Sequence, residues 1–440
     1  MHAAPVSQTD RLGVIDAIRG VALLGILLMN VPYMGNAYQA HFNINILPGD
    51  GSGANFWCWW TVNHFFEGTM RALFSMLFGA GSVLLLDRLE RNPPPGITPA
   101  DIFYRRLIWL LIFGLFNAYV LMWAGDILYA YAICGLFLYP FRHVKPKKLL
   151  VFSVVLMFFS TLQHSAKMWD AAGKREKGQA AQLLVRQEVA LTEAQKESLD
   201  AWKEYQHEHS LTHQRAMVAK EIADMQEGTL TSIFGKMAEV NGYIETKDMY
   251  NELFFDVLAF FMLGMALFRS GYVTGSWPAG RYLAFAMAGY AVGILLSHYI
   301  IRSMVQVGFD QSLLPRYFSL SLYQVKRCAL AIGHFSLLLL LFRLNWIPLF
   351  FRMLAPVGQM AFTNYLMQSI FAALFFHGYG FAMFGRLERY ELYLYVACVW
   401  IFQIIFSAVW LKIFRFGPFE WLWRSLTYWK MPPMLRSNQE

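Results

Sequence analysis

Charged side chains are scarce in this sequence. Asp, Glu, Lys and Arg make up 15% of its 440 residues, whereas they make up about 25% of a typical soluble protein. Apolar residues reach 57%, which is too large an excess to hide in one core and excludes an ordinary soluble protein. Aromatic residues at 17% are typical of chains that place amphipathic rings where an apolar phase meets water. We therefore interpret the sequence as a polytopic membrane protein.

Cysteine is also scarce, and its spacing excludes several kinds of site. The four cysteines lack the paired spacing of zinc sites, redox motifs or disulfide frameworks: Cys58, Cys134, Cys328 and Cys398. His207, His209 and His213 include one helical i, i+4 pair, but no Cys or carboxylate pattern completes a metal site. We expect a solvated helix face there and no metal. The net charge of +8 indicates membrane orientation rather than nucleic-acid binding.

Long apolar runs are abundant. A hydrocarbon core of about 30 Å needs roughly 20 apolar residues, and every backbone polar group must pair inside the segment, which favours helices. The sequence therefore predicts an all-α, polytopic membrane protein with about ten transmembrane helices. They lie near 13–33, 61–86, 103–121, 126–141, 149–165, 252–268, 282–301, 322–342, 354–376 and 391–414, the fourth being short and the eighth weakened by Lys326 and Arg327.

Lys and Arg near the span ends fall on alternate connections. The connections at 34–60 and 122–125 contain neither residue, whereas 87–106, 142–148 and 412–436 are rich in them. Cytoplasmic connections of membrane proteins carry the excess of Lys and Arg. The pattern therefore predicts that both termini are cytoplasmic.

One long insert interrupts the spans. Residues 166–250 mix acidic and basic residues with helical apolar spacing, and parity predicts that they lie outside the cytoplasm as a small helical cap or hairpin. The chain is thereby divided into transmembrane segments at 1–165 and 251–440. The run "FRFGPFEWLWRSLTYWK" predicts an interfacial helix near the C-terminus.

The first span contains charged and polar residues whose placement in a bilayer costs free energy. Asp16 and Arg19 are three residues apart on one helical face, and Asn30 closes the span. Two interpretations stay open: a structural ion pair, or a role in a polar cavity. Gly20 and Gly25 would let a neighbouring helix approach closely.

The second span and the third connection carry further candidates. Glu67 and Arg71 are four residues apart, which favours an i, i+4 ion pair, with a catalytic carboxylate as the alternative. Gly79 and Gly81 favour close helix packing over a nucleotide-binding loop. Asp126 begins the fourth span, where a carboxylate caps free N–H groups or, alternatively, orients a histidine from another span.

The ninth span carries a polar stripe. In "GQMAFTNYLMQS", Asn364 and Gln368 are four residues apart, and Tyr365 lies beside them. Such a stripe either bonds to another helix or lines a ligand site. We predict that the polar residues of the first and ninth spans converge on one cavity: Asp16, Arg19, Asn30, Asn364, Tyr365 and Gln368.

Five motifs together give a resemblance to a known family. The chain resembles the YeiB-like family of bacterial membrane proteins in "RLGVIDAIRGVALLGILLMN", "LFSMLFGAG", "GDILYAYA", "GQMAFTNYLMQS" and "FRFGPFEWLWRSLT". That family is grouped with transmembrane acyltransferases, including lysosomal heparan glucosaminide N-acetyltransferase and the bacterial O-acyltransferases of surface polysaccharides. The resemblance implies a multi-pass protein of the bacterial inner membrane that transfers an acyl group.

The same resemblance singles out two catalytic candidates. Polysaccharide O-acyltransferases carry an Asp, a following Arg and, after ten intervening residues, a His; Asp16 and Arg19 match, but Asn30 replaces the histidine. The lysosomal enzyme is similar to this chain in having Asn there, with its essential His eleven residues later, which corresponds to His41. By this resemblance His41 would be a general base, and Asn30 would donate to an oxyanion. A loop histidine without a catalytic role is the alternative.

Two classes of function follow from these residues. The first is an acyltransferase that uses cytoplasmic acetyl-CoA or another acyl-CoA as cosubstrate, without a tightly bound cofactor, and acylates a glycan, a lipid or a small molecule. The second is a transporter or flippase, in which the same polar residues line a route and no bond changes. Membrane lipids and a second copy of the chain are further expected partners. Basic residues of the cytoplasmic connections are candidates for holding CoA phosphates: Arg88, Arg105, Arg106, Lys145 and Lys147.

Overall fold

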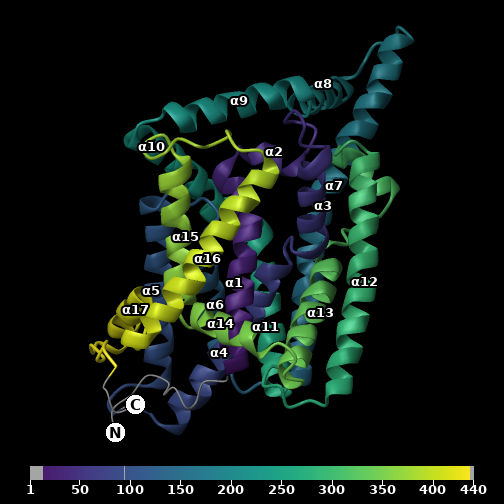
Figure 1. Ribbon diagram of the computed structural model, residues 1–440. Helices are drawn as coiled ribbons and strands as arrows, with labels where there is room; N and C mark the ends of the chain where they lie inside the picture. The colour runs from purple at the N-terminus through teal and green to yellow at the C-terminus, as the bar shows by residue number, and fades with distance from the viewer. Residues whose placement is uncertain (1–12, 94, 437–440) are drawn as a thin grey trace.

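The computed structural model describes residues 13–93 and 95–436, and Figure 1 shows them as a bundle of helices. The remaining residues, 1–12, 94 and 437–440, lie outside the described part of the chain. Within the described residues, the regular elements are helical, apart from one isolated bridge between Phe414 and Leu435. The predicted all-α polytopic fold is confirmed.

The helices of the N-terminal part lead from one end of the bundle to the other and back. They are α1 (Gly13–Gly35), α2 (Tyr38–Phe42), α3 (Gly53–Phe65), α4 (Thr69–Arg91), α5 (Pro99–Leu115), the π-helix η2 (Phe116–Val120), α6 (Leu128–Leu136) and the 3₁₀ turn η3 (Tyr139–Phe141). The C-terminal part consists of α11 (Phe254–Arg269), α12 (Ala279–Gln306), the 3₁₀ turn η5 (Gln311–Arg316), α13 (Tyr323–Arg343), α14 (Pro348–Gln359), α15 (Ala361–Phe376), α16 (Arg389–Ile413) and α17 (Pro418–Tyr428).

Eight helical segments in the described residues are long and apolar enough to cross a membrane. They are Gly13–Gly35, Gly53–Arg91, Pro99–Val120, Pro146–Arg186, Leu230–Arg269, Ala279–Gln306, Tyr323–Arg343 and Arg389–Ile413. The predicted count of ten is therefore corrected at two places. The stretch 126–141 gives only the nine-residue α6, and the stretch 354–376 is divided at Met360, where the backbone (φ −105°, ψ 29°) leaves the helical range.

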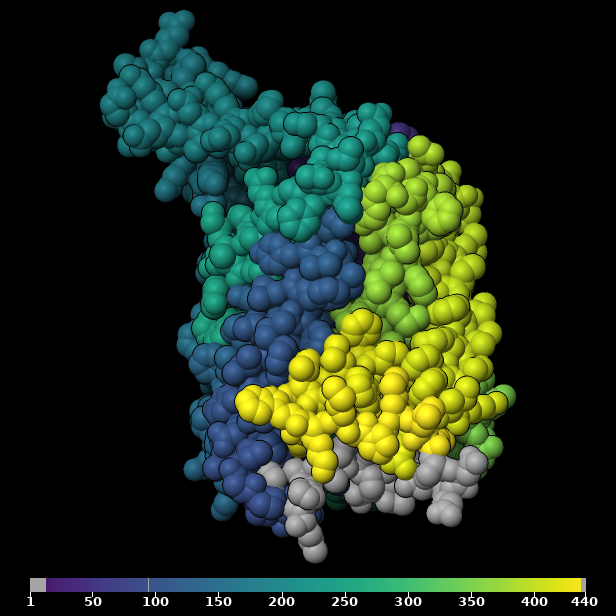
Figure 2. All heavy atoms as spheres, turned by 90° about the vertical axis from the view of Figure 1, so that its left-hand side faces the viewer, coloured from purple at the N-terminus to yellow at the C-terminus, as the bar shows by residue number. Residues whose placement is uncertain are grey.

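The insert is helical, and its boundaries fall inside continuous helices. The span that begins at 146 runs on as α7 (Pro146–Arg186), followed by α8 (Glu193–Glu208), α9 (Leu211–Glu227), α10 (Leu230–Tyr243) and the π-helix η4 (Ile244–Leu253). Figure 1 shows α8 and α9 lying across one end of the bundle, while α17 and the start of α1 lie at the other end. In Figure 2 the segment around the α7–α8 connection projects beyond the bundle. We call these the α9 end and the α17 end.

Glycines set the distance between several helices. A Cβ at Gly79 of α4 would overlap the carbonyl oxygen of Phe261, and one at Gly264 of α11 would overlap that of Met76. Gly20 meets Gly358 at the crossing of α1 and α14 in the same way. The expected close packing is therefore confirmed for Gly20 and Gly79, because backbone meets backbone at these crossings.

Gly79 and Gly81 provide a matched test of this packing. We expect Gly79→Ala to lower the thermal unfolding midpoint of the purified protein, since overpacking costs about 1–3 kcal/mol. Gly81→Ala, two residues along the same helix, should leave the midpoint unchanged or raise it, because a Cβ added there would meet no atom within 4 Å and Ala is the better helix former. Equal effects of the two substitutions, measured by thermal unfolding in detergent, would contradict the crossing geometry.

Candidate functional site

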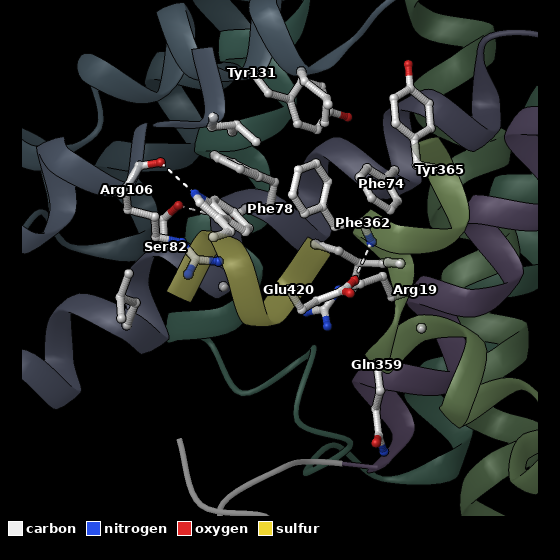
Figure 3. Close-up of a pocket in the computed structure, with 18 of the residues that line it drawn as sticks. Arg19, Phe74, Phe78, Ser82, Arg106, Tyr131, Gln359, Phe362, Tyr365 and Glu420 are labelled. Atoms are coloured by element: carbon white, nitrogen blue, oxygen red, sulfur yellow. Dashed lines mark hydrogen bonds between the residues drawn. The ribbon is translucent and has the colours of Figure 1, made fainter. Parts of the chain in front are cut away.

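A cavity of about 270 Å³ lies between α1, α4, α5, α6, α14, α15 and α17. Figure 3 shows it as a space ringed by aromatic and charged side chains from these helices. Its apolar wall includes Phe74, Leu77 and Phe78 of α4, Leu107 of α5 and Phe362 of α15. Gly81 also lines the cavity, and its missing side chain leaves room there. The space is therefore suited to an apolar or slender group.

Charged residues line the cavity toward the α17 end. Asp16 and Arg19 come from the first turns of α1, Arg106 from the early turns of α5, and Glu420 from α17. Arg19 donates to Asp16 over 2.9 Å, so the ion pair, one of the two interpretations left open, forms at the cavity wall. Among the described residues, the second carboxylate oxygen of Asp16 is buried without a partner. The guanidinium of Arg106 lies over the ring of Trp423, 3.7 Å from its centroid. Three guanidinium groups, those of Arg19, Arg106 and Arg424, thus border one portion of an otherwise apolar space.

Glu420 joins α17 to the interrupted ninth span. Its carboxylate accepts from the backbone N–H groups of Phe362 and Thr363, at 2.7 and 3.1 Å, and from the hydroxyl of Thr363 at 2.5 Å. The break at Met360 exposes these N–H groups, because the first donors of a helix have no partner within it. Burial raises the pKa of Glu420. The carboxylate therefore caps α15 and closes one wall of the cavity.

Two tyrosines, Tyr131 and Tyr365, line the inner end of the cavity, away from the α17 end. The hydroxyl of Tyr131 lies 2.6 Å from that of Ser75, and the hydroxyl of Tyr365 accepts from the backbone N–H of Ile127 over 3.1 Å. Tyr365 also reaches the carboxylate of Asp126 at 3.4 Å. Asp126 accepts from the N–H of Tyr129 over 2.8 Å, so the expected cap of α6 is confirmed.

The faces of α1 and α4 that line the cavity continue toward the α9 end. On α1, Ile26 lines the cavity, and Asn30 and Tyr33 follow it by four and seven residues. On α4, Arg71 precedes the lining residue Phe74 by three. Residues spaced by three, four and seven share one face of a helix. Asn30, which is half-buried, and Arg71 therefore lie on the helix faces that line the cavity, nearer to the α9 end.

His41 lies beyond this face, in the short helix α2. Its ring packs against that of Tyr33, with 3.9 Å between centroids and a tilt of 32°. Within the described part of the chain, its Nδ1 is buried without a hydrogen-bond partner. Burial, together with the positive charge of Arg389, lowers the pKa of His41 to about 3. A small cavity of about 10 Å³, the size of a single water, separates it from Asn36 and the ion pair of Asp50 with Arg389. The imidazole is therefore neutral at physiological pH.

The predicted ion pair between Glu67 and Arg71 is wrong. Helix α3 ends at Phe65 and α4 begins after Gly68, which is left-handed (φ +67°), so Glu67 lies in the turn between them and i, i+4 geometry does not apply. Glu67 instead accepts from Lys326 and Tyr323, at 2.8 and 2.7 Å. Arg71 donates to Asp256 over 3.0 Å, and Arg327 donates to the other oxygen of Asp256 over 2.6 Å. We call the five charged residues the outer charge network: Glu67, Arg71, Asp256, Lys326 and Arg327.

The predicted convergence of the polar stripe on the cavity is also corrected. Of its three residues, Tyr365 lines the cavity, whereas Asn364 and Gln368 bond to α16. Asn364 donates to Ser407 over 2.9 Å, and Gln368 donates to Gln403 over 3.1 Å. Adjacent positions on a helix point about 100° apart, so one residue faces the cavity while its neighbour faces another helix. Asn364 and Gln368 therefore hold α15 against α16.

Among the basic candidates for phosphate binding, Arg106 lines the cavity. Arg105 donates to the carbonyl of Thr427 and stacks on Trp429, which fixes it against α17 and the segment that follows. Arg88 lies in the last turn of α4, and Lys145 and Lys147 lie at the start of α7. These four share the α17 end of the bundle but are not part of the cavity wall.

Several residues of the site were not proposed as site residues from the sequence. Asp256 lies in the apolar run "FFDVLAFFMLG", and Arg327 follows the start of an apolar helix, so their cost in a membrane was the available signal. Tyr131 has no such signal, because tyrosine is common in these spans. Within residues 13–93 and 95–436, no group of three or more His, Cys, Asp or Glu side chains is placed to hold a metal ion.

Comparison with known proteins adds a family relationship. Residues 267–430 match a family model described as "Protein of unknown function (DUF418)". The chain is 29% identical to "Uncharacterized protein YxaH" of Bacillus subtilis (strain 168), over 99% of this chain and 98% of that protein. It is 27% identical to "Uncharacterized protein YeiB" of Escherichia coli (strain K12), over 95% of this chain and 96% of that protein. No solved structure matches the chain. These matches support the resemblance to a YeiB-like family along nearly the whole chain.

Proposed function

We propose that the protein is a membrane-embedded acyltransferase. It takes an acyl group from acyl-CoA, which enters the cavity from the α17 end, and passes it to an acceptor that approaches from the α9 end. The observation that carries this proposal is the cavity itself, because it combines an apolar interior with three guanidinium groups, those of Arg19, Arg106 and Arg424. The continuous helix faces that lead from the cavity toward His41 support the same path.

The chemistry of acyl-CoA fits this division of the cavity. The nucleotide part is anionic, and arginine binds phosphate through charge-assisted hydrogen bonds. The thioester arm is slender, and the cavity of about 270 Å³ lies just below the range of roughly 300–1,000 Å³ usual for whole ligands. The arm therefore enters the apolar interior, and the nucleotide stays at the α17 end.

The proposed reaction needs a base and an oxyanion donor beyond the cavity. An acceptor hydroxyl or amine loses its proton, its oxygen or nitrogen bonds to the thioester carbonyl carbon, and the C–S bond breaks to release the CoA thiol, which takes up a proton. The buried Nδ1 of His41, which has no hydrogen-bond partner among the described residues, is the proposed acceptor of that proton. Asn30, on the α1 face that leads from the cavity, would donate to the developing oxyanion.

This proposal requires the α17 end to be cytoplasmic, in the inner membrane of a bacterium. The distribution of Lys and Arg supports that orientation. We expect reporter fusions in the α8–α9 connection and after α17 to report opposite compartments, with the C-terminal fusion cytoplasmic. Signals from the same compartment would exclude the topology on which the donor path depends.

Gly81 allows the cavity to be filled by one substitution. We expect Gly81→Leu to weaken binding of acetyl-CoA and of S-acetylpantetheine by at least about tenfold. The added side chain would occupy the space in which the thioester arm makes its apolar contacts, and a loss of about 1.4 kcal/mol lowers affinity tenfold. Arg106→Gln should weaken acetyl-CoA binding and spare S-acetylpantetheine, which lacks the phosphates. Isothermal titration of the purified variants measures both ligands.

The control for this test is Gly242→Leu in α10, where the added side chain also meets no atom within 4 Å of its Cβ. Its affinity for both ligands should equal that of the parent protein. Unchanged acetyl-CoA binding by Gly81→Leu would remove the cavity from the proposed donor path.

His41 is tested by transfer rather than by binding. We expect His41→Gln to lower the rate of acyl transfer by about 10²–10⁴, the usual contribution of a general base, with acyl-CoA affinity unchanged. His64→Gln is the matched control, since His64 is also a buried imidazole with an unpartnered Nδ1, stacked on Trp60.

Because the pKa of His41 is lowered to about 3, its base form persists as the pH falls from 7 to 5. A rate loss centred near pH 6.5 that disappears in His41→Gln would contradict this account.

Transport without chemistry is the second candidate. It is favoured by two helix breaks, one beside the cavity at Met360 and one beside the outer charge network at Gly68, because transporters build substrate sites from broken helices. Radiolabelled acetyl-CoA with vesicles that contain the protein separates the two functions. Label found in a new covalent product supports transfer, whereas movement of intact substrate supports transport.

A further inference from the structure

We propose that Arg71 in the outer charge network binds an anionic group, a carboxylate or a phosphate, of the molecule that approaches from the α9 end. This inference rests on the proposed function, because it assigns the acceptor to a chemical class. It uses residues that lie beyond the donor cavity and that no part of the donor path requires.

The network is assembled from three helices and the turn that precedes one of them. Glu67 lies just before α4 and Arg71 in its first turn, Asp256 lies in the first turn of α11, and Lys326 and Arg327 lie in the first turns of α13. Arg327 also donates to the carbonyl of Gly68 over 3.0 Å, which fixes the break between α3 and α4. Asp256 and Arg327 are buried, with side chains 2% and 0% exposed. The network is therefore rigid at its centre.

The charges of this network do not cancel. Two carboxylates, those of Glu67 and Asp256, face three cations, those of Arg71, Lys326 and Arg327, so the sum is +1. Lys326 is paired with Glu67, and Arg327 with Asp256, which leaves Arg71 to share a carboxylate that is already bound. An uncompensated charge at membrane depth is expensive. The excess cation therefore favours a further anion.

The hydrogen bonds give the same result as the charges. Each of the four carboxylate oxygens already accepts a hydrogen bond: from Tyr323 and Lys326 at Glu67, and from Arg327 and Arg71 at Asp256. Two donors remain, since Nε of Arg71 and Nη2 of Arg327 are buried and donate to no acceptor in the described residues. Buried donors without a partner cost about 1–3 kcal/mol each. What the network lacks is an acceptor oxygen with negative charge.

Arg71 is the member that a ligand reaches. Its side chain is 32% exposed, whereas Lys326 is 6% and Arg327 0% exposed. It belongs to the same face of α4 as the cavity residue Phe74, so a group bound there lies on the path from the cavity to the α9 end. The first turn of a helix also carries the positive end of the helix dipole, which adds to the attraction for an anion. An acceptor with a carboxylate or phosphate near its reactive hydroxyl or amine fits this arrangement.

The test measures anion binding without acyl-CoA. Purified protein in neutral detergent is titrated with glycerol 3-phosphate and with glucuronate at constant ionic strength, with glycerol and glucose as uncharged counterparts, and the thermal midpoint is followed. We expect at least one anion to raise the midpoint and its uncharged counterpart to leave it unchanged. Arg71→Gln should raise the apparent Kd for that anion by at least about tenfold, because it removes a charge-assisted hydrogen bond.

Two further variants keep the test decisive. Arg302→Gln removes an exposed cation at the α9 end of α12 and should leave anion binding intact. Arg71→Lys keeps the charge beside Asp256 and so preserves the fold if Arg71→Gln unfolds; it should still weaken binding, because an ammonium cannot donate in bidentate fashion. Nanodiscs of phosphatidylglycerol, with nanodiscs of phosphatidylcholine for comparison, test whether a lipid headgroup is the source of the anionic group.

Stabilisation that depends on Arg71, by a soluble anion or by phosphatidylglycerol, supports the proposal and identifies the source. Anion binding that survives in Arg71→Gln or Arg71→Lys, or no stabilisation by any of the probes, overturns it. Loss of acetyl-CoA affinity in Arg71→Gln also overturns it, since the anion would then belong to the donor. Anion binding that depends on Arg71 in a protein without acyl-CoA affinity would instead remove the proposed acyltransferase and leave this site in place.

Discussion

The carboxylate of Asp256 holds two guanidinium groups at once, and much of the bundle depends on that contact. It joins α11 to α4 through Arg71 and to α13 through Arg327. Removing one partner of a buried pair leaves an uncompensated charge and typically costs about 3–5 kcal/mol. Arg327 in turn holds the carbonyl of Gly68, where a Cβ would overlap both Arg327 and Tyr323. The direction in which α4 leaves this break therefore depends on the ion pairs beside it.

The cavity depends on glycine residues in the helices around it. Gly79 and Gly264 bring α4 against α11, and Gly20 and Gly358 bring α1 against α14, so that backbone contacts fix these four helices. Gly81, on the face of α4 toward the cavity, has no such neighbour and leaves space. The break at Met360 then turns α15, whose free N–H groups are taken up by Glu420. In Figure 2 the C-terminal segment lies across the lower part of the bundle.

The two ends of the molecule offer opposite environments to a substrate. The α17 end presents guanidinium groups beside an apolar space, which suits a molecule with an anionic head and a slender arm. The α9 end presents a buried charge network, a neutral imidazole and the helical cover formed by α8 and α9. A donor and an acceptor that arrive from opposite sides would meet along the shared faces of α1 and α4.

Spacing along single helices was enough to predict several features before the fold was known. Apolar runs predicted the spans, the i, i+3 spacing predicted the Asp16–Arg19 pair, and the start of a helix predicted the cap by Asp126. Which helix each polar face meets was visible only in the folded chain. There Glu67 pairs with Lys326 and Arg71 with Asp256, although their spacing had predicted that Glu67 and Arg71 pair with each other. Asn364 bonds to Ser407 instead of lining the cavity. Helical periodicity fixes where a side chain points on its own helix, whereas its partner depends on glycine crossings and helix breaks contributed by segments far away in the chain.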